Sequence, residues 1–211
     1  MPIPSTILHD LHRAGFDRKI TPEEINRLPI TQYTGHIEMI TTVSALENVL
    51  GILLQETLIG FDTETKPAFR KGERNPVAII QCATGTTVYI IQLRNLPSLR
   101  PLKPLFSSPA IIKAGIDVFQ DILKLREQLP CAYENFVDIG RMARDAGLKN
   151  FSMRALAAVL LGVRIPKTMR TSNWARQQLT PQQITYAATD AWISRCLYLQ
   201  LADFYQKHAA R

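Results

Sequence analysis

The sequence predicts an α/β domain built on a mixed β-sheet of five to six strands with helices on both faces. Its 211 residues are 46% apolar, which is enough for a sizeable core and favours one domain over two. From residue 35 onward, strand-like and helix-like segments follow one another along the chain. Three adjacent strand-like runs come early and predict an antiparallel meander, and the later alternation of strand and helix adds parallel strands.

The first 35 residues differ in composition and are predicted to form an N-terminal extension, with the domain itself spanning residues 36–211. Thr21, Pro22 and Glu24 match a capping box with proline at the first helical position, so we expect a short helix through Arg27. Pro29 then ends this helix. No function is assigned to the extension.

Each element of the domain is predicted from the spacing of its apolar residues. The expected strands cover residues 36–40, 58–61, 77–82, 87–93, 110–116 and 136–139. The expected helices cover residues 44–55, 121–128, 141–146, 152–161 and 181–207.

Composition narrows the functional classes. The net charge is +7, from 25 Lys and Arg against 18 Asp and Glu, which favours polyanionic partners but is a weak signal alone. Cys82, Cys131 and Cys196 are odd in number and lack metal-ligand spacing, so a disulfide framework or zinc site is disfavoured and buried small residues are expected. Neither a signal peptide nor an apolar run of membrane-spanning length is present, so we expect a cytoplasmic protein without a membrane partner.

An acidic pair follows the apolar run of residues 58–61. Asp62 and Glu64 are two positions apart on a strand, so both side chains point to the same face, with about 7 Å between their Cα atoms. One metal ion can contact both. A buried strand that delivers two carboxylates is costly unless a cation compensates their charge. A plain surface strand end is the alternative.

A second acidic position lies where a strand passes into a helix, in residues 113–121. Asp121 is expected at the start of this helix, whose inner face includes Ile122 and Leu125. A carboxylate there also commonly caps free backbone N–H groups. Asp117, in the same segment, is a competing candidate for the functional position.

The third element is the helix that begins near residue 180. Thr180, Pro181 and Gln183 form a strong helix start, which fixes the register of the helix. Tyr186 and Asp190 then fall four residues apart on one face, about 6 Å along the axis. A half-buried hydrogen bond between the two is the simple alternative.

Taken in order, these segments match a known pattern. Residues 61–67 (Phe-Asp-Thr-Glu-Thr-Lys-Pro), Lys113-x-Gly115 with Asp121, and Tyr186-x-x-x-Asp190 resemble the three motifs of the DEDD superfamily of 3′→5′ exonucleases. The resemblance is to the tyrosine-bearing branch, which includes ribonuclease D and the Werner syndrome exonuclease domain. Residues 172–174 (Ser-Asn-Trp) also look like the segment before the third motif. The second motif lacks the glycine that often precedes its aspartate, so Asp117 stays open, although the spacing from the lysine favours Asp121.

The resemblance implies a ribonuclease H-like fold and a catalytic site that holds two divalent cations, Mg²⁺ or Mn²⁺. By this analogy, Asp62 bridges both ions, Glu64 and Asp190 complete one site, and Asp121 holds the other. Tyr186 orients the attacking water. The sister branch carries histidine five positions before its last aspartate, where this sequence has Thr185.

The implied partner is the 3′ end of a nucleic acid, DNA or RNA. Trp174 is expected either to stack on a base or, more simply, to pack in the core. A binding module without catalysis, an endonuclease and a deadenylating nuclease are the rival functions. Residues expected to contact substrate are Thr63, Lys66, Phe69, Arg70, Lys113, Lys167, Arg170 and Trp174.

Overall fold

A computed structural model describes residues 13–68, 70, 72, 74–166, 169 and 171–209. Its centre is a six-stranded sheet with the strand order β1-β4-β3-β2-β5-β6. The strands are β1 (His36–Ile40), β2 (Leu58–Thr65), β3 (Val77–Ala83), β4 (Thr87–Gln92), β5 (Ile112–Gly115) and β6 (Phe136–Asp138).

The sheet is mixed, as the sequence predicted. Strands β2, β3 and β4 form the expected antiparallel meander, and β5 and β6 extend it in parallel beyond β2. The first strand lies at the far edge, where it pairs in parallel with β4. This position of β1 depends on a long-range pairing that no local pattern specifies.

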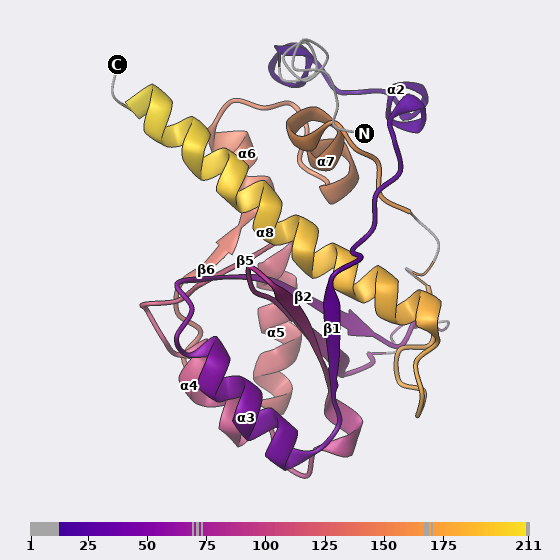
Figure 1. Cartoon of the computed structure of the whole chain (residues 1–211), viewed down its shortest axis with the longest axis vertical. Helices are drawn as coiled ribbons and strands as arrows, with labels where there is room; N and C mark the ends of the chain where they lie inside the picture. Colours follow the sequence, from indigo (N-terminus) through magenta and orange to yellow (C-terminus); the bar gives the residue numbers. More distant parts are fainter. Residues whose placement is uncertain are drawn as a thin grey trace.

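Helices cover both faces of the sheet, which confirms the predicted layers (Figure 1). The long α8 crosses one face, with α6, α7 and the N-terminal residues beyond it, while α3, α4 and α5 lie on the opposite face. No helix in the described ranges is both long and apolar enough to cross a bilayer. The helices are α2 (Pro22–Arg27), α3 (Val43–Leu53), α4 (Lys103–Phe106), α5 (Val118–Gln128), α6 (Ile139–Asp145), α7 (Met153–Leu161) and α8 (Pro181–Ala209).

Side chains alternate between two apolar layers along the buried strands. On β4, Tyr89 and Ile91 join the core under α3 and α5, whereas Val88 and Ile90 face α8. Burial on both faces explains why the central strands read as continuous apolar runs. The core under α3 also contains a cluster of aromatic rings at edge-to-face angles, formed by Phe61, Phe106 and Phe136.

Gly60 allows α8 to approach β2 unusually closely. A Cβ atom at this position would lie 2.0 Å from the carbonyl oxygen of Ala191 and 2.8 Å from the backbone nitrogen of Arg195. Both contacts are with backbone, which cannot move aside without shifting the helix. Small residues on the facing side of α8, Ala187, Ala188 and Ala191, are fully buried and complete this contact. The axis of α8 therefore lies close to the strand that carries the first acidic pair.

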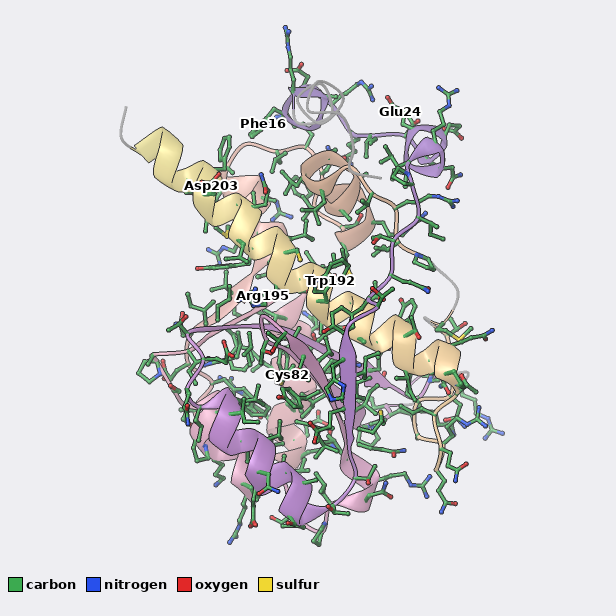
Figure 2. All side chains as sticks on the ribbon, in the orientation of Figure 1. Phe16, Glu24, Cys82, Trp192, Arg195 and Asp203 are labelled. Atoms are coloured by element: carbon green, nitrogen blue, oxygen red, sulfur yellow. The ribbon has the colours of Figure 1, made fainter. Side chains whose placement is uncertain are left out.

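The N-terminal extension packs against α7 and α8. The predicted capping box of α2 is present, because Thr21 Oγ1 accepts from Glu24 N and the Glu24 carboxylate accepts from Thr21 N. Ile20 and Ile25 are buried in the core beside α7, and Phe16, labelled in Figure 2, stacks on Phe204 of α8 with ring centroids 5.1 Å apart. The segment that follows α2 runs past α8 before it enters β1 (Figure 1).

Two details of the fold differ from the sequence prediction. Helix α5 begins at Val118, so Asp121 lies in its first turn and not at its start. The residue before the helix is Asp117, in the left-handed conformation with φ 55°, which aspartate tolerates better than most residues. Between β4 and β5, the short α4 and the 3₁₀ turns η1 (Leu93–Asn95) and η2 (Arg100–Leu102) were not predicted.

The three cysteines are free, as expected. Cys82 is fully buried on β3, on the side of the sheet that faces α3 (Figure 2). Burial raises the pKa of its thiol to about 12, so it remains protonated and behaves as a small apolar residue. Cys131 and Cys196 are only half-buried, so the expectation of buried cysteines is confirmed for Cys82 alone.

Candidate active site

Strand β2 presents its acidic pair on the face that α8 covers. Ile59 and Phe61 point into the core under α3 and α5, so the alternate positions, Gly60, Asp62 and Glu64, face α8. The strand is buried at residues 58–61 and half-buried at both carboxylates. Because Asp62 and Glu64 both face α8, the same-face geometry inferred from their spacing is confirmed. Their partial exposure places both carboxylates where the sheet reaches solvent.

The start of α8 is held in place by side chains of the preceding segment. Thr180 and Gln183 cap each other, through Thr180 N to Gln183 Oε1 at 2.9 Å and Gln183 N to Thr180 Oγ1 at 3.2 Å. Gln183 Nε2 also donates to Ser172 Oγ and to the carbonyl of Asn173. The Ser-Asn-Trp segment thus fixes the position of the first turn of α8.

Asp190 of α8 completes a cluster with the acidic pair of β2. One carboxylate oxygen each from Asp62, Glu64 and Asp190 lies within 4.8 Å of the others. Tyr186, one turn earlier on α8, hydrogen-bonds to Asp190 through its side chain. The centroid of its ring lies 6.0 Å from that of Trp174, so the two rings pack against each other.

The charges of these groups oppose one another. Burial, followed by the charges of Asp190, Asp121 and Glu64, raises the pKa of Asp62 well above its usual range. Burial raises the pKa of Asp190 to about 7, and the hydrogen bond from Tyr186 partly offsets this rise. A cluster of carboxylates with raised pKa values is stabilised by a bound cation, because the cation removes their mutual repulsion.

Asp121 approaches the cluster from α5. Its Oδ1 accepts a hydrogen bond of 2.7 Å from Thr63 Oγ1, and burial raises its pKa to about 7 despite that bond. Asp121 contributes to the raised pKa of Asp62, whereas Asp117 is not among the groups that do so. Of the two candidates in this segment, the one favoured by spacing is therefore the one that acts on Asp62.

Three expected substrate contacts do not fit the structure. Lys113 is fully buried, where its Nζ donates to the carbonyl of Ser108 at 2.7 Å and lies over the ring of Phe136. Burial lowers the pKa of Lys113 to about 8. Trp174 is also fully buried, which confirms the simpler expectation of core packing and excludes stacking on a base. Thr63 is 8% exposed with its hydroxyl directed to Asp121. Each is held by tertiary contacts that sequence spacing does not reveal.

The other expected contacts are divided between exposed residues and residues outside the described ranges. Lys66 and Arg70 are exposed beyond the end of β2, where a substrate can reach them. Phe69, Lys167 and Arg170 lie outside the described residues.

The N-terminal extension reaches the candidate site, which no pattern in the sequence predicts. A pocket of about 260 Å³ beside α8 is lined by Gln32 of the extension together with Tyr186 and Asp190. The backbone N–H of Tyr33 donates to Thr189 Oγ1 at 2.9 Å, one residue before Asp190. This contact joins segments 156 residues apart.

Comparison with known proteins decides the family. A family model described as 3′-5′ exonuclease matches residues 37–204. This chain belongs to the 3′-5′ exonuclease family. Among its relatives, this exonuclease domain is 30% identical over 189 residues to the mouse bifunctional 3′-5′ exonuclease/ATP-dependent helicase WRN, a match that covers 84% of the chain and 13% of the mouse protein.

Further matches place the domain in the tyrosine-bearing branch. It is 26% identical to ribonuclease D of Haemophilus influenzae over 83% of the chain and 44% of that protein. The fold resembles the crystal structure of the Nibbler EXO domain of Aedes aegypti, with a TM-score of 0.76 at 22% identity over 84% of this chain and 93% of the other. This confirms the ribonuclease H-like fold. The exonuclease domain spans only a part of both curated relatives named here.

Proposed function

We propose that this chain hydrolyses the terminal phosphodiester bond at the 3′ end of a nucleic acid and releases nucleoside monophosphates. The observation that carries the proposal is the convergence of Asp62, Glu64 and Asp190 within 4.8 Å, near the C-terminal end of β2 and beside Tyr186. A purely structural cluster of this kind is costly, because three half-buried or buried carboxylates repel one another.

The donor set fits a hard divalent cation. All candidate ligands are carboxylate oxygens, which suit Mg²⁺ or Mn²⁺ rather than softer metals. Asp62, Glu64 and Asp190 would hold one ion, and Asp62 with Asp121 would hold a second. Two such ions, when bound, supply a nucleophilic hydroxide at neutral pH and stabilise the departing 3′ oxygen. Asp62 is assigned to both ion sites because the charges of Asp190 and of Asp121 each raise its pKa.

The side chains of the chain itself position the reaction. Burial and the neighbouring carboxylates raise the pKa of Tyr186, so its hydroxyl remains protonated at neutral pH. A protonated phenol orients a water molecule by hydrogen bonding and does not act as the base. Thr63 holds Asp121 in the orientation needed for its role through the 2.7 Å bond between their side chains.

The substrate end must enter from solvent beside β2. Lys66 and Arg70 are exposed just beyond the acidic pair and can neutralise a phosphate there. The sheet and α8 close the opposite side, since Gly60 leaves no space between them. This arrangement supports attack on a strand end rather than on the middle of a duplex.

The test is a gel time course on 5′-labelled single-stranded and recessed DNA and RNA, with Mg²⁺, Mn²⁺ or chelator. We expect a ladder that shortens from the 3′ end only when metal is present and that disappears in Asp62→Asn. A circular single strand should resist, because cleavage of the circle would instead indicate an endonuclease. A poly(A) tail and a random tail should shorten alike, since preference for poly(A) would indicate a deadenylase. Binding without any cleavage would refute the proposal in favour of a binding module.

A further inference from the structure

A groove of about 700 Å³ lies beside the carboxylate cluster, and of its lining residues only Lys66 has a role in the function proposed above. It is bounded by the end of β2, the start of β3, the η1–η2 segment and the C-terminal end of α5. Four basic side chains line it: Lys66, Arg94, Arg100 and Lys103. We call this feature the basic groove.

Among the described residues that line the basic groove, the charge is entirely positive. None of these described lining residues is Asp or Glu, and all four basic side chains are exposed. Within the described part of the chain, none of the four forms an ion pair. Arg94 donates one hydrogen bond to an uncharged acceptor, from its NH1 to the carbonyl of Ala175 at 2.8 Å. Clustered cations without acidic partners attract a polyanion.

The groove begins close to the carboxylate cluster. Lys66 is two residues beyond Glu64, which corresponds to about 7 Å along an extended chain. On the neighbouring strand, Val77 and Ala78 line the groove immediately before Ile79, the pairing partner of Glu64. A strand whose last nucleotide lies at the cluster can therefore continue directly into the groove.

The walls of the groove are already fixed by hydrogen bonds. Gln128 at the end of α5 binds both backbone groups of Val77, accepting from its N–H at 2.8 Å and donating to its carbonyl at 3.1 Å. Gln92 Nε2 donates to the carbonyls of Arg176 and Gln177, which ties the loop before α8 to the end of β4. A ligand that enters such a pre-formed groove loses less free energy to ordering the protein.

We propose that the basic groove binds the phosphodiester backbone of the single strand upstream of the 3′-terminal nucleotide. This inference rests on the proposed function, because it assumes that the 3′ end lies at the carboxylate cluster. The phosphates contact Arg100 and Lys103 farther from the cluster and Lys66 nearer to it. The apolar side chains of the floor, among them Leu96, Leu99 and Leu129, face the sugars and bases. A strand is thus held over several nucleotides while only its last one reaches the acids.

The test measures binding, so that it does not depend on cleavage. In an Asp62→Asn background, the double variant Arg100→Gln and Lys103→Gln removes two charges but keeps most of each side-chain stem. The matched control is Arg27→Gln with Lys149→Gln, which removes the same charge from exposed positions on the far side of α8. Dissociation constants are measured by fluorescence anisotropy for 4- and 20-nucleotide single strands of DNA and of RNA, at several salt concentrations.

We expect the groove variant to weaken binding of the 20-nucleotide strands about tenfold and to lower the salt dependence by roughly 1.4 in log–log slope, about 0.7 for each lost phosphate contact. Binding of the 4-nucleotide strands should change less than twofold. An equal loss in the control pair, or an equal loss for both lengths, would overturn the groove as an upstream path. If wild-type protein binds long strands through the groove but never shortens them, the proposed function is refuted, whereas binding of a single strand by the groove is supported.

Discussion

Strand β2 packs against large aromatic side chains on the face covered by α3 and α5, whereas its contact with α8 on the other face is made by small residues. Under α3 the rings of Phe61, Phe106 and Phe136 meet edge to face. Under α8 the contact is made by Gly60 and buried alanines. The first contact is made by large aromatic rings, and the second allows a helix to approach the acidic strand closely.

The polar residues on the α8 face strengthen this contrast. Gln81 is fully buried, pairs with Asp62 across β2 and β3, and has no hydrogen-bond partner for either amide atom in the described part of the molecule. Ser194 on α8 is buried in the same condition. Unpaired buried polar groups reduce stability. The α8 face therefore gives up stability where the site is assembled, and variants on the two faces should separate activity from stability.

The largest effect is expected for Asp62→Asn. Cleavage should fall by at least about 10³-fold, because the carboxylate shared by both expected ions is lost. In chelator, however, the variant should unfold at the same temperature as wild type or higher, since one of the repelling buried charges is gone. Initial rates and thermal unfolding in chelator measure the two quantities. Asp117→Asn is the matched control and should retain activity; loss of activity there would reassign the ligand on α5.

Phe106→Ala should show the opposite behaviour. Removing a fully buried ring from the aromatic cluster is expected to lower the free energy of unfolding by about 3–5 kcal/mol. Below its unfolding temperature the variant should retain its cleavage rate, because Phe106 contacts no candidate ligand. Urea unfolding and a rate measured at low temperature test this pair of results. A large loss of rate in the folded variant would show that the two faces are not separable.

Gly60→Ala should affect both stability and activity. The added methyl group meets backbone of α8, so we expect a loss of about 1–3 kcal/mol in unfolding free energy. The displaced helix carries Tyr186 and Asp190 away from β2, which should reduce the rate about 10²-fold. Gly51→Ala is the control, because nothing lies within 4 Å of that position and alanine should stabilise α3 by about 0.5–1 kcal/mol. Normal activity of Gly60→Ala would mean that the close approach is not required.

The smallest effect is expected for Tyr186→Phe. The substitution removes the phenol hydroxyl and with it one hydrogen bond to a charged group, which is worth about 1.5 kcal/mol. We therefore expect kcat to fall about tenfold and KM to stay nearly unchanged. Stability should change little, because the ring still packs against Trp174. Steady-state kinetics on a short single strand measure the difference. An unchanged kcat would reduce Tyr186 to a packing residue.

Local patterns were sufficient to predict most of the fold. The strand at residues 36–40 and the start of α8 at Pro181 agree with the structure because alternation and capping are properties of short segments. The same is true of Asp62 with Glu64 and of Tyr186 with Asp190, whose spacing alone places each pair on one face. The convergence of the two pairs came from the family resemblance.

Long-range packing accounts for what the sequence did not reveal. Lys113 was expected to contact substrate, but its position is decided by Phe136 and Ser108, which other segments supply. Helix α5 begins at Val118 and not at the predicted residue 121, because Asp117 takes a left-handed conformation that no spacing rule requires. The basic groove was not predicted from the sequence because its lining residues are distributed over more than 100 positions of the chain.

The last carboxylate of the cluster is carried by the last helix. Asp62, Glu64 and Asp121 are synthesised before the chain reaches α8, and domains generally fold as units during synthesis. Until α8 has emerged and docked on Gly60, the nascent chain has neither Tyr186 nor the third carboxylate of the cluster. The order of the elements therefore delays assembly of the candidate site until this helix is in place.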